Sequence, residues 1–171
     1  MSKSWQIVLA GEGGQGLILA GRILSEAAII DGNNVSLTSS YGIAARGGYS
    51  EAQVVISDQE LYYPKCASPD LVLALTQQAY DRYADKVNDD CLIVYDSKSV
   101  SNTQGKNEIG YDFKDALLTL GNLKVINSLF LGVILKHRDI VSRESMIEAL
   151  KKNLPPKIQD INLEAFQYGL E

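Results

Sequence analysis

The sequence predicts an α/β protein in which helices flank a mostly parallel β-sheet, and three features indicate this. An apolar strand at 6–10 leads through a glycine-rich turn into an unusually apolar helix at 17–30. Two later apolar runs, at 71–75 and 91–96, are typical of strands that are buried on both faces of a parallel sheet. A helical pattern at 77–87 lies between these runs, so strands and helices alternate along the chain.

The turn after the first strand is the first candidate ligand site. Gly13, Gly14, Gln15 and Gly16 lie between the strand and the helix. Backbone N–H groups and the helix dipole at such a point favour an anion, typically a phosphate. With Gly11, the turn also satisfies Gly-x-Gly-x-x-Gly, a pattern of dinucleotide-binding folds. In the alternative interpretation, the glycines only allow a tight turn and close packing of the helix on the strand.

The second candidate site is a loop between a strand at 35–38 and a strand at 50–57, which apolar alternation predicts. Its candidate ligand-binding residues are Ser40, Tyr41, Gly42, Arg46, Gly47 and Gly48. An arginine fork binds phosphate or carboxylate through two hydrogen bonds, and flanking glycines let a ligand approach the backbone. Alternatively, this is a surface loop whose arginine caps a carbonyl group or pairs with an acid.

The next elements are a polar segment and two helices. Residues 97–110 are polar and contain glycine, which predicts a loop or an irregular sheet edge. A helix at 112–120 follows, closed by Gly121 and Asn122. The apolar stretch at 125–135 predicts a helix in the core or at a subunit interface.

The chain then closes with an amphipathic helix at 142–153, ended by two prolines, and a short helix at 162–169. No linker, internal repeat or low-complexity stretch interrupts the sequence. We therefore expect one domain over residues 1–171.

Composition argues against several classes of protein. A net charge of −5 argues against nucleic-acid binding, because such domains are usually basic on one face. No apolar run approaches the roughly 20 residues that span a bilayer, and no signal segment precedes the first strand. The two cysteines, Cys66 and Cys91, fit no disulfide framework, so we expect a cytoplasmic protein. Together with the single histidine, His137, they form no recognisable catalytic or metal-binding set.

Taken together, these segments resemble the gamma subunit of 2-oxoacid:ferredoxin oxidoreductases, a family that acts on pyruvate, 2-oxoglutarate or ketoisovalerate. The resemblance covers nearly the whole chain, and the segments at 63–65 and 162–166 look most like the 2-oxoglutarate branch. Glu12 departs from it, because many relatives have an apolar residue there. The matching segments are 10–16, 20–21, 40–42, 46–48, 54–58, 68–70, 120–122 and Asn127.

The resemblance implies a fold and a role. The fold is a three-layer domain like the gamma domain, domain III, of pyruvate:ferredoxin oxidoreductase. These enzymes (EC 1.2.7.-) decarboxylate a 2-oxoacid on thiamine diphosphate, reduce ferredoxin through [4Fe-4S] clusters and form acyl-coenzyme A. Thiamine diphosphate, Mg and the clusters are expected on alpha and beta partner subunits, with a ferredoxin-like delta subunit in some complexes. The gamma chain alone is not expected to be catalytic; it completes the assembly and helps to bind coenzyme A.

The resemblance also implies which residues contact coenzyme A. The glycine turn would present N–H donors, and Arg46 with Ser40 and Tyr41 would supply charged and hydroxyl contacts. Asn122 and Asn127 complete the predicted set, together with Gly42, Gly47 and Gly48 of the loop.

Two other interpretations remain open at this point. One is a stand-alone NAD(P)-binding Rossmann protein, which needs an acidic residue about 20 residues past the glycines to bind the ribose. The end of the second strand offers only Thr38, Ser39 and Ser40 there. The other is a scaffold that binds no ligand.

Overall fold

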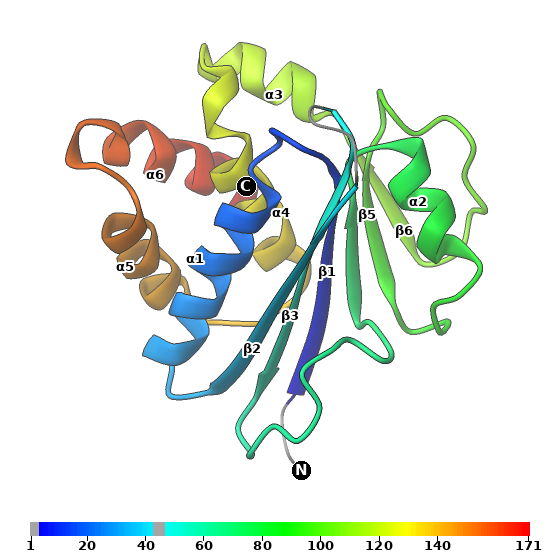
Figure 1. Cartoon of the computed structure of the whole chain (residues 1–171). Helices are drawn as coiled ribbons and strands as arrows, with labels where there is room; N and C mark the ends of the chain where they lie inside the picture. The colour runs from blue at the N-terminus through cyan, green and yellow to red at the C-terminus, as the bar shows by residue number, and fades with distance from the viewer. Residues whose placement is uncertain (1–3, 43–46) are drawn as a thin grey trace.

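The computed structural model describes residues 4–42 and 47–171. Within these residues, six strands form one sheet in the order β2-β3-β1-β4-β5-β6 (Figure 1). The pairs β1–β4, β4–β5 and β5–β6 are parallel, and β3 runs antiparallel to both β1 and β2. The strands are β1 (Ser4–Glu12), β2 (Asn34–Tyr41), β3 (Tyr49–Ser57), β4 (Leu71–Ala74), β5 (Leu92–Asp96) and β6 (Glu108–Tyr111). The prediction of an α/β fold with a mostly parallel sheet is confirmed.

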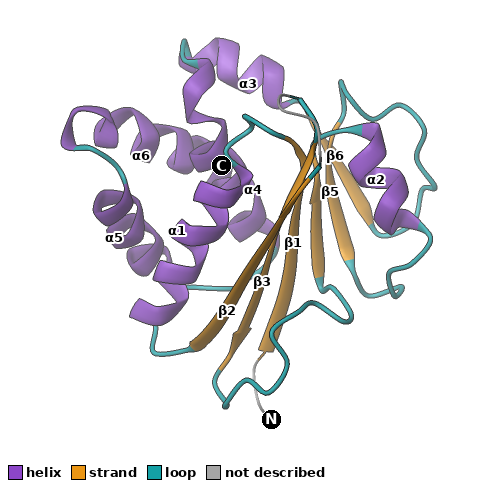
Figure 2. Cartoon of the chain, viewed as in Figure 1, coloured by secondary structure: helices purple, strands orange, loops and turns teal. Residues whose placement is uncertain are grey.

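Helices cover both faces of the sheet, which gives three layers (Figures 1 and 2). On one face lie α1 (Leu17–Ile30), α4 (Ile126–His137), α5 (Arg143–Asn153) and α6 (Pro156–Leu170). On the other face lies α2 (Gln77–Ala84). The remaining helix, α3 (Phe113–Leu120), lies at the top in Figure 1 and continues through the 3-10 turn η1 (Leu123–Val125) into α4.

The two very apolar helices are buried inside the chain itself. Helix α1 lies between the sheet and α5, and α4 packs closely against α6. Glycines permit that closeness: a Cβ atom at Gly132 would stand 2.2 Å from the Phe166 carbonyl oxygen, and one at Gly169 would stand 2.3 Å from that of Leu129. The sequence predicts that residues 125–135 lie either in the core or at a subunit interface, and the structure places them in the core. The apolar character of these helices therefore does not by itself indicate a partner surface.

Of the two alternatives for the polar segment 97–110, the sheet edge is confirmed at its end, which contributes to β6 beside β5. Two elements differ from the sequence prediction. Strand β2 extends to Tyr41 because it stays paired with β3, so Ser40 and Tyr41 lie in a strand and not in the loop. The last helix begins at Pro156, well before residue 162, because a proline suits the first turn of a helix. The same two prolines therefore end α5 and open α6.

The strand order reverses next to β1, because the chain continues toward opposite edges of the sheet after β1 and after β4. From β1 it passes through α1 to β2 on one face of the sheet, whereas from β4 it passes through α2 to β5 on the other face (Figure 1). In open α/β sheets, ligands bind outside the carboxyl ends of the strands at such a switch point. The glycine turn follows the carboxyl end of β1, so the fold places it at this position. We call this end of the sheet the carboxyl edge.

Candidate ligand site at the carboxyl edge of the sheet

The glycine turn is shaped by glycines and by the side chain of Gln15. Gly14 and Gly16 have φ angles of 97° and 76°, in the left-handed region that favours glycine. Gln15 Oε1 accepts a hydrogen bond from the Glu12 N–H at 2.7 Å. It lies over Gly11, where a Cβ atom would stand only 2.2 Å away. Gln15 therefore supports the turn with its side chain.

The structure narrows the set of N–H donors that a ligand could use. The Gly13 N–H donates to the Gly48 carbonyl oxygen at 2.9 Å, and the Gln15 N–H donates to that of Glu12 at 3.3 Å. Within the described residues, the N–H groups of Gly14 and Gly16 have no acceptor. Helix α1 has no side-chain cap and no acidic residue in its first turn. This end of α1 is suited to an anion because its N–H groups and dipole are uncompensated.

The hydrogen bond from Gly13 to Gly48 joins the two candidate segments. The second segment is the turn between β2 and β3, which is closed by a hydrogen bond of 2.6 Å from the Gly42 N–H to the Tyr49 carbonyl oxygen. Gly47 has a φ of 67°. Arg46, the predicted cation of this segment, lies outside the described residues. The structure thus brings the glycine turn and the β2–β3 turn together at the carboxyl edge.

The two predicted asparagines have different settings. Asn127 is buried in α4 beside the glycine turn: a Cβ atom at Gly16 would stand 3.3 Å from its Cβ and 3.6 Å from its Nδ2. Its Oδ1 accepts a hydrogen bond from the Ser128 N–H at 2.9 Å. Asn122 caps η1, since its Oδ1 accepts from the Lys124 N–H at 2.9 Å. Of the two, Asn127 is the one that adjoins the glycine turn.

The last two residues of β2 point to opposite faces of the sheet. Tyr41 pairs with Ser50 and Ser40 pairs with Glu51, and paired residues of antiparallel strands share a face. Tyr41, which is 70% exposed, therefore lies on the α1 side, and Ser40 lies on the α2 side. A cavity of about 170 Å³ opens on the α2 side. Its lining residues are Thr38, Ser39, Ser40, Glu51, Gln53 and Lys65.

Sequence reasoning missed Glu51, a buried carboxylate on β3 that is only 5% exposed. It accepts hydrogen bonds from the hydroxyl groups of Tyr49 and Tyr83 and from the Gln53 amide, the last two at 2.7 Å. Burial, followed by the hydrogen bond to Glu51, raises the pKa of both tyrosines far above the usual value, so both remain protonated donors. The sequence does contain a signal for Glu51, because it is an acid within a strand whose other residues are apolar or uncharged.

Glu12 does not oppose an anion at the end of α1. It is the last residue of β1, and alternation along the strand puts its side chain on the same face as that of Ala10. Ala10 packs among residues of α2 and its neighbours. The carboxylate of Glu12 is therefore directed to the α2 side, away from α1.

Comparison with known proteins identifies the family of this chain. The profile of the pyruvate ferredoxin/flavodoxin oxidoreductase family matches residues 6–171. The chain belongs to this family. It is similar to the 2-oxoglutarate synthase subunit KorC of Methanocaldococcus jannaschii, with 39% identity over 173 residues that cover 97% of this chain and 92% of the relative.

Two solved structures have the same fold. The gamma subunit of a keto/oxoacid ferredoxin oxidoreductase from Geobacter sulfurreducens is 35% identical, with a TM-score of 0.84 over 97% of this chain and 96% of that one. The 2-oxoglutarate:ferredoxin oxidoreductase from Magnetococcus marinus, solved with 2-oxoglutarate, coenzyme A and succinyl-CoA bound, has a TM-score of 0.87. The match covers 98% of this chain and 30% of that one, and at 24% identity it shows the fold alone. The chain is thus a gamma subunit of a multisubunit 2-oxoacid:ferredoxin oxidoreductase (EC 1.2.7.-), as the sequence resemblance implied.

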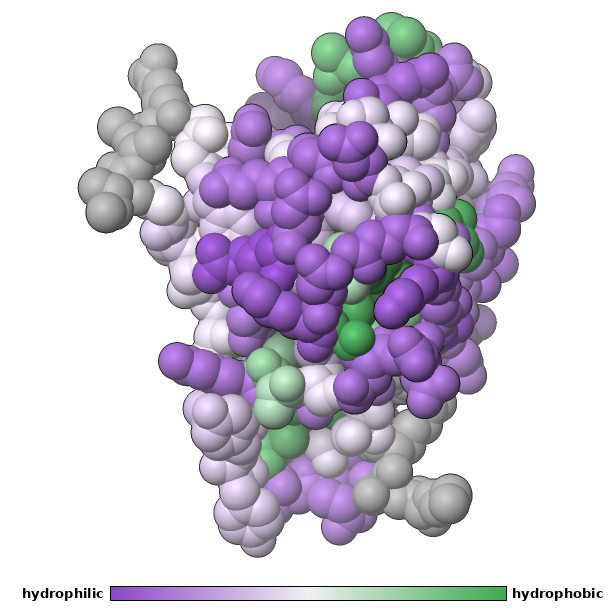
Figure 3. All heavy atoms as spheres, turned by 90° about the vertical axis from the view of Figure 1, so that its right-hand side faces the viewer, coloured by the Kyte–Doolittle hydropathy of each residue, from purple (hydrophilic) through white to green (hydrophobic). Residues whose placement is uncertain are grey.

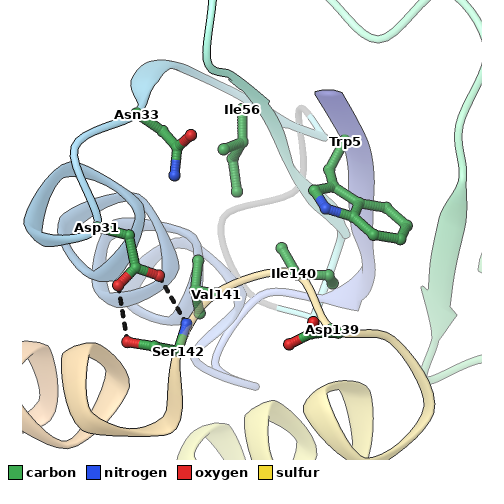
Figure 4. A pocket seen from close by; sticks show the side chains of 8 residues that line it. All are labelled: Trp5, Asp31, Asn33, Ile56, Asp139, Ile140, Val141 and Ser142. Atoms are coloured by element: carbon green, nitrogen blue, oxygen red, sulfur yellow. Dashed lines mark hydrogen bonds between the residues drawn. The ribbon is translucent and has the colours of Figure 1, made fainter. Parts of the chain in front are cut away.

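A second cavity of this gamma subunit, of about 320 Å³, lies at the other end of the sheet (Figure 4). Asp31 lines it, and its carboxylate accepts hydrogen bonds of 2.6 Å and 2.7 Å from the N–H and hydroxyl of Ser142. These bonds attach the start of α5 to the end of α1. The Trp5 indole N–H, on the opposite wall, is buried without an acceptor in the described part of the chain. The cavity is separate from the glycine turn.

In the gamma subunit, burial raises the pKa of the Cys66 thiol to about 12 and that of the Cys91 thiol to about 11. Among the described residues, no cluster of His, Cys, Asp or Glu could hold a metal ion, and no helix is long and apolar enough to cross a membrane. Hydrophilic residues cover most of the face shown in Figure 3, which is the right-hand side of Figure 1.

Proposed function

We propose that this chain is the accessory gamma subunit of a cytoplasmic 2-oxoglutarate:ferredoxin oxidoreductase and that its carboxyl edge helps to bind coenzyme A. In this proposal, residues 1–171 act as one gamma domain that completes an assembly with alpha and beta subunits. The proposal assigns thiamine diphosphate, Mg and the [4Fe-4S] clusters to those partners. For the clusters, the reason is that two cysteines cannot form a four-cysteine cluster site. The similarity to the 2-oxoglutarate synthase subunit of Methanocaldococcus jannaschii favours this substrate.

The observation that carries the proposal is the pair of N–H groups of Gly14 and Gly16, which have no acceptor in the described residues, at the uncapped end of α1. Coenzyme A carries phosphate groups, and a helix N-terminus in a glycine-rich turn binds phosphate through backbone N–H groups. The Magnetococcus marinus enzyme, of which this chain matches 30% of the length, was solved with coenzyme A bound. In this proposal, Arg46, Tyr41 and Asn127 would surround the phosphate at the end of α1, and Ser40 would contact the ligand from the α2 side of the sheet.

The role of Arg46 is tested in the assembled complex. We expect Arg46→Ala to raise the KM for coenzyme A about tenfold, because one charge-assisted phosphate contact of roughly 1.4 kcal/mol is lost. The KM for the 2-oxoacid should not change. Arg143→Ala is the matched control, since Arg143 is an exposed arginine at the start of α5, away from the carboxyl edge. An unchanged KM for coenzyme A in the Arg46 variant would remove Arg46 from the site.

The strand order of the sheet disagrees with that of a Rossmann dinucleotide-binding protein. In a dinucleotide-binding fold, β1 and β2 are neighbouring parallel strands, whereas here the antiparallel β3 lies between them. Asp31, the acid nearest the required spacing, binds Ser142 at the other end of the sheet. Thermal unfolding of the purified chain with coenzyme A, NAD or NADP compares the two, because a ligand that binds only the folded state raises the midpoint. We expect a rise with coenzyme A; a rise with NAD or NADP alone would favour the Rossmann alternative.

A further inference from the structure

A buried polar network connects the carboxyl edge to α2, and Glu51 is at its centre. One carboxylate oxygen accepts from Tyr49 and Tyr83, and the other accepts from the Gln53 amide. The Arg82 Nε lies 4.0 Å from the first oxygen. Gln53 extends the network further, since its Oε1 accepts from the Cys66 N–H at 3.2 Å.

Such a network specifies one arrangement of the groups that it joins. In a low-dielectric interior each hydrogen bond is strong, and a buried charge that loses its partners is costly. The three donors come from two elements: Tyr49 and Gln53 belong to β3, and Tyr83 belongs to α2. Glu51 therefore fixes the first residue of β3 against both its own strand and the helix.

Tyr49 passes this constraint to the candidate ligand site. Its hydroxyl binds Glu51, while its carbonyl oxygen accepts from Gly42 and so closes the β2–β3 turn. The preceding residue, Gly48, accepts the hydrogen bond from Gly13 of the glycine turn. The path from the buried carboxylate to the proposed anion site is therefore Glu51, Tyr49, Gly48 and Gly13.

The same network also orients a cation. The Arg82 guanidinium lies 4.6 Å from the centre of the Tyr49 ring, in a cation–π contact, and its side chain is 53% exposed. Because Tyr49 is held by Glu51, Arg82 is held beside the β2–β3 turn with part of its guanidinium in water. A positive group is thus presented on the α2 side of the sheet, beside the first residue of β3.

We propose that Glu51 is a positioning residue for coenzyme A binding. Its buried carboxylate holds Tyr49, and through Tyr49 it holds Gly42 and Gly48 in the arrangement that the ligand requires. This inference rests on the proposed coenzyme A role of the carboxyl edge. Glu51 itself does not contact the ligand.

The test uses Glu51→Gln in the assembled complex. Glutamine has the same shape, but its NH₂ group cannot accept the hydrogen bonds that one carboxylate oxygen accepts. We expect the KM for coenzyme A to rise about tenfold while kcat at saturating coenzyme A and the KM for the 2-oxoacid stay within about twofold of the parent values. Tyr49→Phe is a milder second variant, because it keeps the ring beneath Arg82 and removes only the hydroxyl; it should raise the same KM less.

Ser145→Ala is the matched control. Ser145 is also buried, and its hydroxyl donates to a carboxylate, that of Asp31, at 2.6 Å, but at the other end of the sheet. It should leave the KM for coenzyme A unchanged, whereas a rise equal to that of Glu51→Gln would mean a general loosening and overturn the inference. An unchanged KM for coenzyme A in Glu51→Gln and Tyr49→Phe, with a raised KM in a glycine-turn variant such as Gly14→Ala, overturns the inference about Glu51 and leaves the coenzyme A role standing. An unchanged KM in all three rejects the coenzyme A role and the inference with it.

Discussion

Gly14→Ala is expected to raise the KM of the assembled complex for coenzyme A about tenfold or more, because a methyl group in contact with a bound phosphate forces the ligand away from the backbone. Gly14 has a φ of 97°, and nothing in the described structure lies within 4 Å of the position that its Cβ would take. In the free subunit this position is open, and in the proposed complex it adjoins the ligand. The KM for the 2-oxoacid should stay unchanged.

The control for this variant is Gly32→Ala at the opposite end of α1. Gly32 has a φ of 83°, and again nothing lies within 4 Å of its Cβ position. Both variants therefore carry the same kind of backbone strain, about 1–2 kcal/mol for a left-handed non-glycine residue. Steady-state kinetics with coenzyme A as the varied substrate compares the two. Equal KM values for the two variants would mean that the turn does not approach the ligand.

Gly132→Ala is expected to lower the free energy of unfolding of the purified chain by about 3 kcal/mol or more, the upper range for overpacking a core. The new methyl group would stand 2.2 Å from the Phe166 carbonyl oxygen and 3.0 Å from the Gly169 Cα. Both are backbone atoms of α6, so relief requires the two helices to separate. Alanine gains only about 1 kcal/mol of helix propensity over glycine, which does not offset this cost.

Urea unfolding measures that loss, and Gly21→Ala in α1 is the matched control. A Cβ at Gly21 would meet side-chain atoms of Ala52 and Leu37, each at 3.0 Å. Both contacts are longer than the 2.2 Å contact at Gly132, and the end of the Leu37 side chain can shift, so we expect a smaller loss of stability. A Gly132 variant as stable as the parent chain would show that α4 and α6 do not pack as described.

Much of the fold was predictable because its signals are local. The apolar runs of β4 and β5 and the apolar helix α1 are visible as continuous patterns in the sequence. Edge strand β6 could be predicted only as one of two alternatives, because it is four residues long and mixed in polarity and becomes a strand only by pairing with β5. The sequence pattern underpredicts the length of α6, because a proline can follow the end of one helix or begin the next, and Pro156 begins α6.

The candidate site was predictable in its segments and not in its contacts. The sequence shows glycines that can expose N–H groups, but it does not show that the Gly13 N–H is already bound by Gly48 on a different strand connection. Glu51 is a stronger example. Its partner Tyr83 lies 32 residues away on α2, so only the folded sheet brings the hydroxyl to the carboxylate.

The central claim, that coenzyme A binds at the carboxyl edge, is tested most directly by amide hydrogen exchange of the assembled complex with and without coenzyme A. The N–H groups of Gly14 and Gly16 have no acceptor within the described residues, so they should exchange quickly in the free complex. We predict that coenzyme A slows exchange at these two amides and in the β2–β3 turn, and leaves α5 unchanged. Slowed exchange confined to partner subunits, with no change at the glycine turn, would contradict the account.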